Sequence, residues 1–323
     1  MKIVFIGHGE NFNQMSIQAV CIARDISKPI SPWEYRQWPG KWPLGNSQVG
    51  NCIFIPPING EFLGDWLVCL TPPPPVIKTT IPKEKRIFFM METPDFWSPE
   101  PNFLDQFGCV VSPYTISNFS GFQVNSVTTG LFWWYGISMK NHTPGNSWLC
   151  FDEIQSEAFP EKNKLISTIT SSKLFLPGHK KRFTFTHQLK DYYGDKLDLF
   201  GSDINPIPDK RDGLVHYKYH IAIENSIYPH YWTEKLSDPL LARCIVFYAG
   251  ASEIGQYFSN KIVIPINIEN FDETIKIIDA HLNENSNPIE EIEESRKKML
   301  YDFNFPFFCD ELIKYLIKKS EIY

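Results

Sequence analysis

Short apolar runs recur along the whole chain, and each is followed by turn residues or by a polar stretch. The runs show little alternation between apolar and polar positions, which is typical of strands that are buried on both faces, as in parallel sheets. The predicted strands are Ile3–Ile6, Cys52–Ile55, Trp66–Leu70, Arg86–Met90, Cys109–Val111, Leu165–Ile169, Leu197–Phe200, His220–Ile223, Cys244–Tyr248 and Lys261–Pro265.

Helical patterns lie between these runs. The clearest are Gln14–Arg24, Lys181–Tyr192, Thr233–Ala242, Asp272–Leu282 and Ile289–Leu300. Alternation of strands and helices predicts an α/β, doubly wound architecture. Turn-rich and polar residues near 140–162 divide the chain, so we expect one α/β domain over residues 1–150 and a second over 151–304. The broad apolar face within residues 305–323 predicts a C-terminal helix that packs back on the body of the protein.

Length and charge narrow the class of protein. The chain has 323 residues, enough for about two domains, and 31 basic against 37 acidic residues give a net charge of −6. Such a balance is unsuited to non-specific nucleic-acid binding. No apolar run reaches the roughly 18 residues that span a bilayer, and no signal peptide is recognisable, so we expect a cytoplasmic protein. The seven cysteines are widely spaced without a C-x-x-C pair, which predicts free thiols.

Common catalytic signatures are missing from the sequence. There is no P-loop, H-E-x-x-H or G-x-S-x-G motif, and Gly7-His8-Gly9 has no third glycine at the spacing of a dinucleotide fingerprint. No Asp-x-Asp pair is present to bridge a metal and a diphosphate. We therefore expect neither a metal nor another cofactor.

The stretch from Tyr217 to Leu236 carries the most information about a site. An apolar strand ends at Ile223, and a helix is expected to begin near Thr233, which is a good N-cap. A helix start at the carboxyl edge of a strand offers unpaired N–H groups to an anion, and Lys235 adds a full charge. Between strand and helix stand the polar residues Glu224, Asn225 and Ser226. From these residues alone, a capped helix with solvated charges remains an equal alternative.

The same stretch, YKYHIAIENS…YWTEKLSDPLLARCIVFYAG, resembles the signature of the glycosyltransferase family 10 α1,3/α1,4-fucosyltransferases, Y-K-F-x-x-x-F-E-N followed by Y-x-T-E-K-L. Ile223 replaces the usual aromatic residue, and Pro239 stands inside the helix. The resemblance covers about residues 165–280. It implies a GT-B fold, in which two Rossmann-like doubly wound domains face each other across a cleft. The second would hold GDP-fucose, and the first would lie on the acceptor side.

The resemblance also implies a set of donor-binding residues. Lys235 would contact the phosphates and Glu234 the ribose. Arg182 matches the arginine that neutralises the diphosphate from the start of a helix, with Lys181 and Lys180 as alternatives. The full donor-binding set is Arg182, Glu224, Asn225, Ser226, Tyr231, Thr233, Glu234 and Lys235.

A catalytic base is expected from the first domain. An apolar strand there ends in Glu92 and a proline turn, and it is similar to the strand and E-S-P sequence that carry the family's proposed catalytic glutamate. Neighbours such as Phe96 and Trp97 would desolvate Glu92 and raise its pKa into the range of a general base. Asp95 and Glu100 are rival carboxylates, and a loop acid that only holds the turn is the alternative.

Together these features predict inverting transfer of L-fucose from GDP-fucose to an acceptor glycan without a metal. The acceptor would be a lipid-linked or lipopolysaccharide glycan reached from the cytoplasmic side, with peripheral membrane contact and no transmembrane segment. The alternatives are another nucleotide sugar, a non-catalytic sugar-nucleotide or glycan-binding protein, or a scaffold that uses its C-terminal helix. Aromatic faces stack on sugars, so the candidate acceptor residues are Trp33, Trp38, Trp42 and Trp97.

Overall fold

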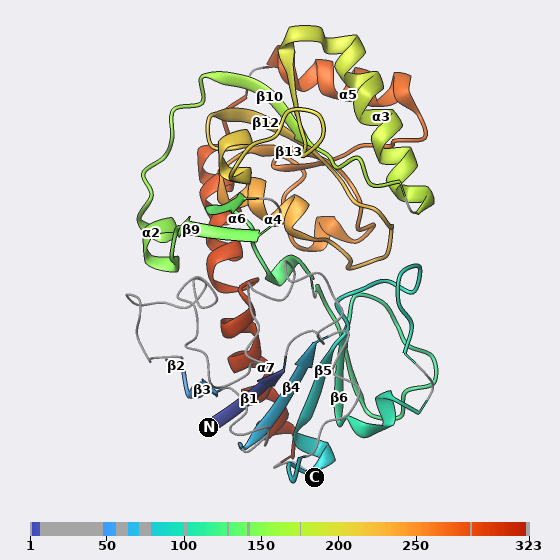
Figure 1. The fold of residues 1–323 in the computed structure, drawn as a ribbon, viewed down its shortest axis with the longest axis vertical. Helices are drawn as coiled ribbons and strands as arrows, with labels where there is room; N and C mark the ends of the chain where they lie inside the picture. Colours follow the sequence, from blue (N-terminus) through green and yellow to red (C-terminus); the bar gives the residue numbers. More distant parts are fainter. Residues whose placement is uncertain are drawn as a thin grey trace.

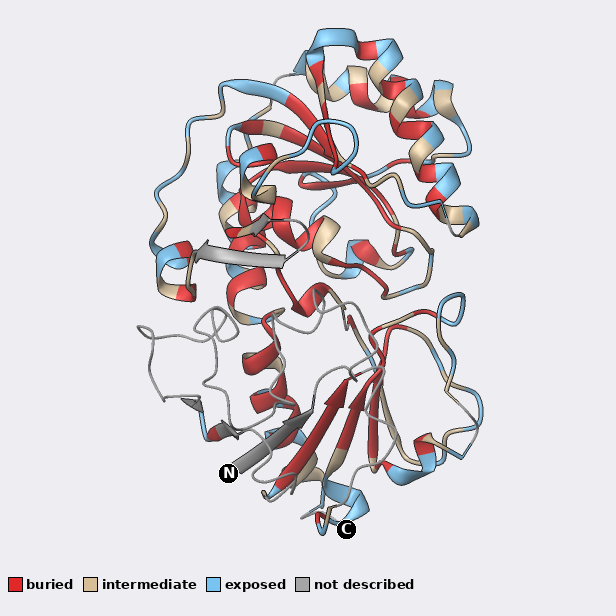
Figure 2. Ribbon diagram, viewed as in Figure 1, coloured by how far each residue is buried: buried red, intermediate tan, exposed pale blue. Residues whose placement is uncertain are grey.

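Two largely parallel β-sheets make up most of the computed structural model (Figure 1), and one hydrophobic core cluster continues from the first sheet to the second. The structure describes residues 2–6, 48–55, 64–70, 79–99, 102–127, 129–140, 143–174, 176–284 and 286–320. The central strands of both sheets are buried along most of their length (Figure 2). This burial explains why they appear in the sequence as continuous apolar runs.

The first sheet has the strand order β2-β3-β1-β4-β5-β6-β7, and all its pairs are parallel except β2 with β3. Its strands are β1 (Lys2–Ile6), β2 (Gln48–Val49), β3 (Cys52–Ile55), β4 (Trp66–Leu70), β5 (Arg86–Phe89), β6 (Cys109–Ser112) and β7 (Phe122–Asn125). Central strand β5 turns successive side chains to opposite faces. Phe88 packs against Phe107 with ring centroids 5.1 Å apart, whereas Phe89 packs against Phe305 at 5.2 Å.

The second sheet has the order β11-β10-β12-β13-β14, and every pair is parallel. Its strands are β10 (Lys164–Ile169), β11 (Leu197–Phe200), β12 (Tyr217–Ile223), β13 (Ile245–Ala249) and β14 (Val263–Pro265). Numbered within this domain the order is 2-1-3-4-5, a doubly wound arrangement that binds ligands outside the carboxyl ends of its strands.

Helices cover both faces of the second sheet (Figure 1). On one face α3 (Pro177–Tyr193) meets α5 (Phe271–Glu284), where the rings of Phe185 and Phe271 lie 5.8 Å apart. On the other face α4 (Glu234–Leu241) packs on α6 (Ile289–Tyr301), and Arg296 donates to the carbonyl of Leu241 at 3.0 Å. The short 3₁₀ helices are η2 (Lys83–Lys85), η3 (Leu104–Gln106), η4 (Thr129–Leu131), η5 (Gly194–Lys196), η6 (Lys210–Gly213) and η7 (Ile254–Gln256).

A β-hairpin stands where the sequence suggested only turns. Strands β8 (Ile137–Lys140) and β9 (Thr143–Trp148) pair antiparallel, and helix α2 (Phe151–Ser156) follows. The prediction of a turn-rich stretch there is wrong for most of β9. In a two-stranded sheet one side of each strand stays unpaired, so Pro144 is tolerated.

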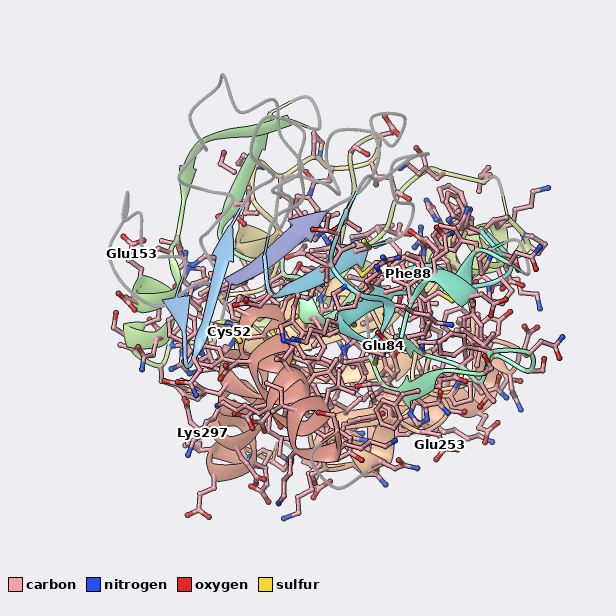
Figure 3. All side chains as sticks on the ribbon, turned by 90° about the horizontal axis from the view of Figure 1, so that it is seen from below. Cys52, Glu84, Phe88, Glu153, Glu253 and Lys297 are labelled. Carbon is pink, nitrogen blue, oxygen red and sulfur yellow. The ribbon has the colours of Figure 1, made fainter. Side chains whose placement is uncertain are left out.

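The last helix, α7 (Phe305–Ser320), returns to the first sheet. The ring of Phe305 stacks on Phe132 at 4.8 Å as well as contacting Phe89. Further along α7, Asp310 accepts a hydrogen bond from the backbone N–H of Asn51 at 3.2 Å. The next residue, Cys52, is labelled beside this helix in the view from below (Figure 3).

The predicted α/β class with two Rossmann-like domains is therefore confirmed by the topology. The described cysteines have free thiols. Cys150 is half-buried, and the others are buried: Cys52, Cys69, Cys109, Cys244 and Cys309. Within the described ranges, none of the helices combines the length and the apolar character needed to cross a bilayer. The predicted helix Gln14–Arg24 lies outside the described residues.

We expect Phe305→Ala to lower the free energy of unfolding by about 3–5 kcal/mol, because a fully buried ring that contacts Phe89 and Phe132 would be replaced by a cavity. Urea unfolding followed by circular dichroism measures this change. Glu311→Ala, at an exposed position on the same helix, is the control and should change the free energy by less than about 0.5 kcal/mol. Equal effects of the two substitutions would contradict the packing described for α7.

Candidate active site between the two sheets

The loops that follow β5 and β12 touch each other. Thr93 donates to the hydroxyl oxygen of Ser226 at 3.4 Å, and the hydroxyl of Tyr228 donates to Asp95 at 3.2 Å. Both loops start at the carboxyl end of a central strand, the usual ligand-binding edge of a doubly wound sheet. The carboxyl edges of the two sheets therefore face each other at this point.

Glu92 is the acid on the first-domain side. It is half-buried, and its carboxylate makes no hydrogen bond or ion pair that the structure records among the described residues. Burial raises its pKa from the ordinary 4.5 to about 7, while Lys235 lowers the pKa and Glu234 raises it further. A carboxyl group with this pKa can take up or release a proton near neutral pH. Its rival Asp95 is exposed and bonded to Tyr228, and Glu100 lies outside the described residues.

Glu224, directly after the end of β12, holds the start of α4 through hydrogen bonds from Thr233. Its side chain is fully buried, and its Oε1 accepts the backbone N–H of Thr233 at 2.8 Å. The hydroxyl of Thr233 donates to Oε2 at 2.9 Å and also accepts the N–H of Lys235 as the N-cap of the helix. The predicted N-cap is confirmed. The carboxylate of Glu224 is thus committed to holding Thr233 rather than standing open to a ligand.

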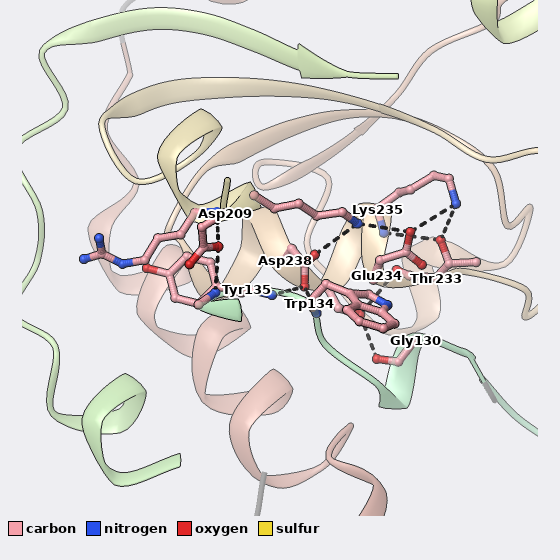
Figure 4. Close-up of polar contacts among 12 residues, drawn as sticks. Gly130, Trp134, Tyr135, Asp209, Thr233, Glu234, Lys235 and Asp238 are labelled. Atoms are coloured by element: carbon pink, nitrogen blue, oxygen red, sulfur yellow. Dashed lines mark hydrogen bonds and ion pairs between the residues drawn. The ribbon is translucent and has the colours of Figure 1, made fainter. Parts of the chain in front are cut away.

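The first turn of α4 brings opposite charges together (Figure 4). Lys235 Nζ lies 3.0 Å from the hydroxyl of Thr233, 3.5 Å from Glu234 Oε1 and 3.6 Å from Glu224 Oε2. Desolvation would raise the pKa of Glu234, but Lys210 and Lys235 outweigh it and hold that pKa well below its usual range. Glu234 is therefore an ionised hydrogen-bond acceptor at any physiological pH.

Arg182 supplies the second cation. It is buried, and its guanidinium donates to Asn225 Oδ1 at 2.5 Å and to the hydroxyl of Ser171 at 2.9 Å. Its Nε atom is buried with no hydrogen-bond partner among the described residues. Because α3 begins at Pro177, Arg182 lies in the second turn of the helix and not at its start, which corrects the prediction.

The three consecutive basic residues near the start of α3, Lys180, Lys181 and Arg182, lie in different surroundings. Lys181 pairs with Glu269 at 2.6 Å on the surface, and Lys180 is exposed. Of the three, Arg182 is the one in contact with the loop after β12. Close packing fixes this contact, since a Cβ atom on Gly178 would come within 1.7 Å of the carbonyl oxygen of Asn225.

Tyr231 lies between the acids of the two domains. The side chain is buried, and desolvation together with Glu92, Glu224 and Glu234 raises the pKa of its hydroxyl well above the usual value. The phenol therefore stays protonated and can donate a hydrogen bond. Asn225 and Ser226, both half-buried, lie in the same loop region.

The aromatic residues predicted to meet an acceptor are placed only in part. Trp33, Trp38 and Trp42 lie outside the described residues. Trp97 packs on the face of the first sheet that bears Phe88, at 6.1 Å from that ring, and at 6.1 Å from Phe103. Its described contacts are thus with core side chains.

Two polar residues were missed by sequence reasoning. Lys210 Nζ lies 3.1 Å from Glu234 Oε1 and 3.4 Å from Asp238 Oδ2. Asp238 stands on the buried face of α4, where an acid between apolar residues is a detectable signal. Lys210 opens a short 3₁₀ helix in an irregular stretch, and no periodicity in the sequence pointed to it. Among the residues that the structure describes, no group of three His, Cys, Asp or Glu side chains could hold a metal ion.

We expect Glu92→Gln to raise the melting temperature at about pH 8 and to change it little at about pH 5. The pKa of Glu92 is higher in the folded protein than in the unfolded chain, so ionising it costs stability as pH rises from the unfolded value towards about 7. The amide cannot ionise and escapes this cost. Differential scanning calorimetry at both pH values measures the effect, and a gain confined to about pH 5 would contradict the assigned burial.

Comparison with known proteins agrees with the motifs of this site. Residues 159–287 match the family model "Glycosyltransferase family 10 (fucosyltransferase) C-term", which spans β10 to α5. Crystal structures of alpha1,3-fucosyltransferase with GDP and with GDP-fucose align over 93% of this chain and 81% of theirs, at 18% identity and a TM-score of 0.48. Both values are low, and the fold assignment rests on the strands of this chain itself. The family model thus confirms the resemblance to glycosyltransferase family 10 over residues 159–287.

Proposed function

We propose that this protein transfers L-fucose from GDP-fucose to a hydroxyl group of an acceptor glycan, with inversion at the anomeric carbon. One observation carries the proposal: a half-buried glutamate with a pKa of about 7, Glu92, faces the first turn of α4 in the segment that matches the fucosyltransferase family model. A base from one domain and cations from the other are the groups that a displacement between the domains requires.

Glu92 acts as the general base. It removes the proton of the acceptor hydroxyl while that oxygen attacks the anomeric carbon of fucose from the face opposite GDP. The bond from the anomeric carbon to the phosphate oxygen breaks at the same time, so a β-linked donor becomes an α-fucoside. A carboxyl group with a pKa of about 7 is about half ionised at neutral pH, and its carboxylate is basic enough to accept a proton.

Lys235 and Arg182 stabilise the departing GDP. The diphosphate gains negative charge as the bond to fucose breaks, so cations bind it more strongly in the transition state than in the donor. The unpartnered Nε of Arg182 supports this role, because a bound phosphate would supply the missing acceptor. With two cations in place, we propose that no metal is needed.

The remaining donor residues have separate roles in this scheme. Glu234 accepts hydrogen bonds from the ribose, while Asn225, Ser226 and Tyr231 line the donor site. Glu224 and Thr233 hold the turn that carries Lys235. The acceptor glycan approaches from the side of the first domain. The proposal also places the protein in the cytoplasm.

We expect Glu92→Gln to reduce kcat by at least about 100-fold, because the amide cannot accept the proton of the acceptor hydroxyl. The Kd for GDP should stay within about threefold of the starting value, since the substitution keeps the cations in place. Release of GDP in the presence of GDP-fucose and lactosamine-type acceptors measures kcat, and calorimetry measures Kd. Asp95→Asn, which changes the neighbouring exposed carboxylate of the same loop, is the matched control. Loss of activity in that control alone would assign the base to Asp95.

We also expect transfer to continue in EDTA and to require GDP-fucose rather than other nucleotide sugars. The cations on the chain replace a metal in charge compensation, so chelation should leave kcat unchanged. A panel of GDP-linked and UDP-linked sugars, with and without EDTA, tests both points. If only another nucleotide sugar is turned over, the proposed mechanism stands but the donor is not GDP-fucose. If a nucleotide sugar binds without turnover, a non-catalytic sugar-nucleotide-binding protein is favoured.

A further inference from the structure

Lys210 bridges two acidic side chains of α4, Glu234 and Asp238, both of which are labelled in Figure 4. Its Nζ lies 3.1 Å from Glu234 Oε1, at the first residue of the helix, and 3.4 Å from Asp238 Oδ2, one turn later. The lysine comes from η6, far from α4 in the sequence. It therefore ties an irregular segment to the turn that carries Glu234 and Lys235.

Asp238 is itself held firmly. Its side chain is 1% exposed, and its Oδ1 accepts the backbone N–H groups of Trp134 at 2.8 Å and Tyr135 at 3.0 Å. These bonds leave Oδ2 facing Lys210. A buried carboxylate fixed by two backbone donors gives the flexible lysine a defined place, because a lysine alone samples many rotamers.

Glu234 depends on that placement. Its side chain is 23% exposed, so it reaches the surface of the site, and the ion pair with Lys210 is its shortest described contact. Without Lys210, a carboxylate of this burial would retain Lys235 at 3.5 Å as its cation. The charge of Glu234 thus rests on both lysines, and its orientation rests on the closer of them, Lys210.

We propose that Lys210 is a positioning residue that holds the Glu234 carboxylate ready to accept hydrogen bonds from the ribose hydroxyls of the donor, with Asp238 holding Lys210 in turn. This inference rests on the proposed function, in which a nucleoside diphosphate sugar is the donor. Its consequence is selectivity: the chain should prefer a nucleotide with both ribose hydroxyls to one without them.

The charged groups around Glu234 give the inference a pH dependence. Lys210 and Lys235 face it directly, and Glu224, Asp238, Arg182 and Glu92 complete its surroundings. Together the two lysines hold the pKa of Glu234 below its usual range against desolvation. When Lys210 is removed, desolvation and the neighbouring carboxylates raise that pKa, so Glu234 should become protonated as the pH falls.

The test compares GDP with 2′,3′-dideoxy-GDP by calorimetry. In the starting protein GDP should bind at least about 10-fold more tightly, as expected for hydrogen bonds to an ionised group. In Lys210→Met the ratio of the two affinities, GDP over 2′,3′-dideoxy-GDP, should fall to within about threefold of the ratio measured for Glu234→Gln. Lys210→Arg keeps the positive charge and should restore part of the ratio. As the pH falls from about 8 to about 5, the affinity of Lys210→Met for GDP should also fall more steeply than that of the starting protein.

Lys164→Met is the matched control, since Lys164 also pairs with a carboxylate, Asp198 at 3.7 Å, but at the opposite end of the second sheet. It should leave the ratio unchanged. Equal weakening of both nucleotides in Lys210→Met, or an unchanged ratio in a folded variant, would overturn the inference. If Lys210→Met fails to fold, Lys210→Gln takes its place, and it should lower the ratio of the two affinities in the same way. Failure of the starting protein to bind GDP would instead refute the proposed function.

Discussion

The buried hydrogen bonds between Glu224 and Thr233 are the constraint on which the rest of the site depends. They join the end of β12 to the start of α4, so the sheet edge and the helix N-terminus cannot move independently. A buried carboxylate is costly unless it is paired and hydrogen-bonded, and here Thr233 and Lys235 satisfy it. Every other charge of the site is placed relative to this turn.

Charges on either side of the turn divide into two groups. Burial lowers the pKa of His179, and the positive charges of Arg182 and Lys235 lower it further. Glu234 is balanced by Lys210, so those two form a nearly neutral pair. Lys235 is paired with Glu224 and Glu234, whereas Arg182 makes no ion pair among the described residues, so Arg182 carries the least compensated positive charge of the site.

Much of the fold could be predicted because strands buried on both faces leave continuous apolar runs, as in β12 and β13. The hairpin β8–β9 was missed, since a two-stranded sheet needs no such run and tolerates Pro144. Glu92 and the residues from Glu224 to Lys235 could be chosen as candidates because each group follows a strand end and resembles a motif of the fucosyltransferase family. Lys210 was not, because its partners lie elsewhere in the sequence and only the folded chain brings them together.

The contact between Phe132 and Phe305 has a mechanical consequence. The chain passes between the two domains twice, after η4 and again before α7, and these aromatic rings stack where the two passages meet. On one side, hydrogen bonds from Trp134 and Tyr135 to Asp238 fasten the first passage to the second domain. The ring pair therefore ties the two passages to each other, while the two backbone hydrogen bonds to Asp238 tie the first passage to α4.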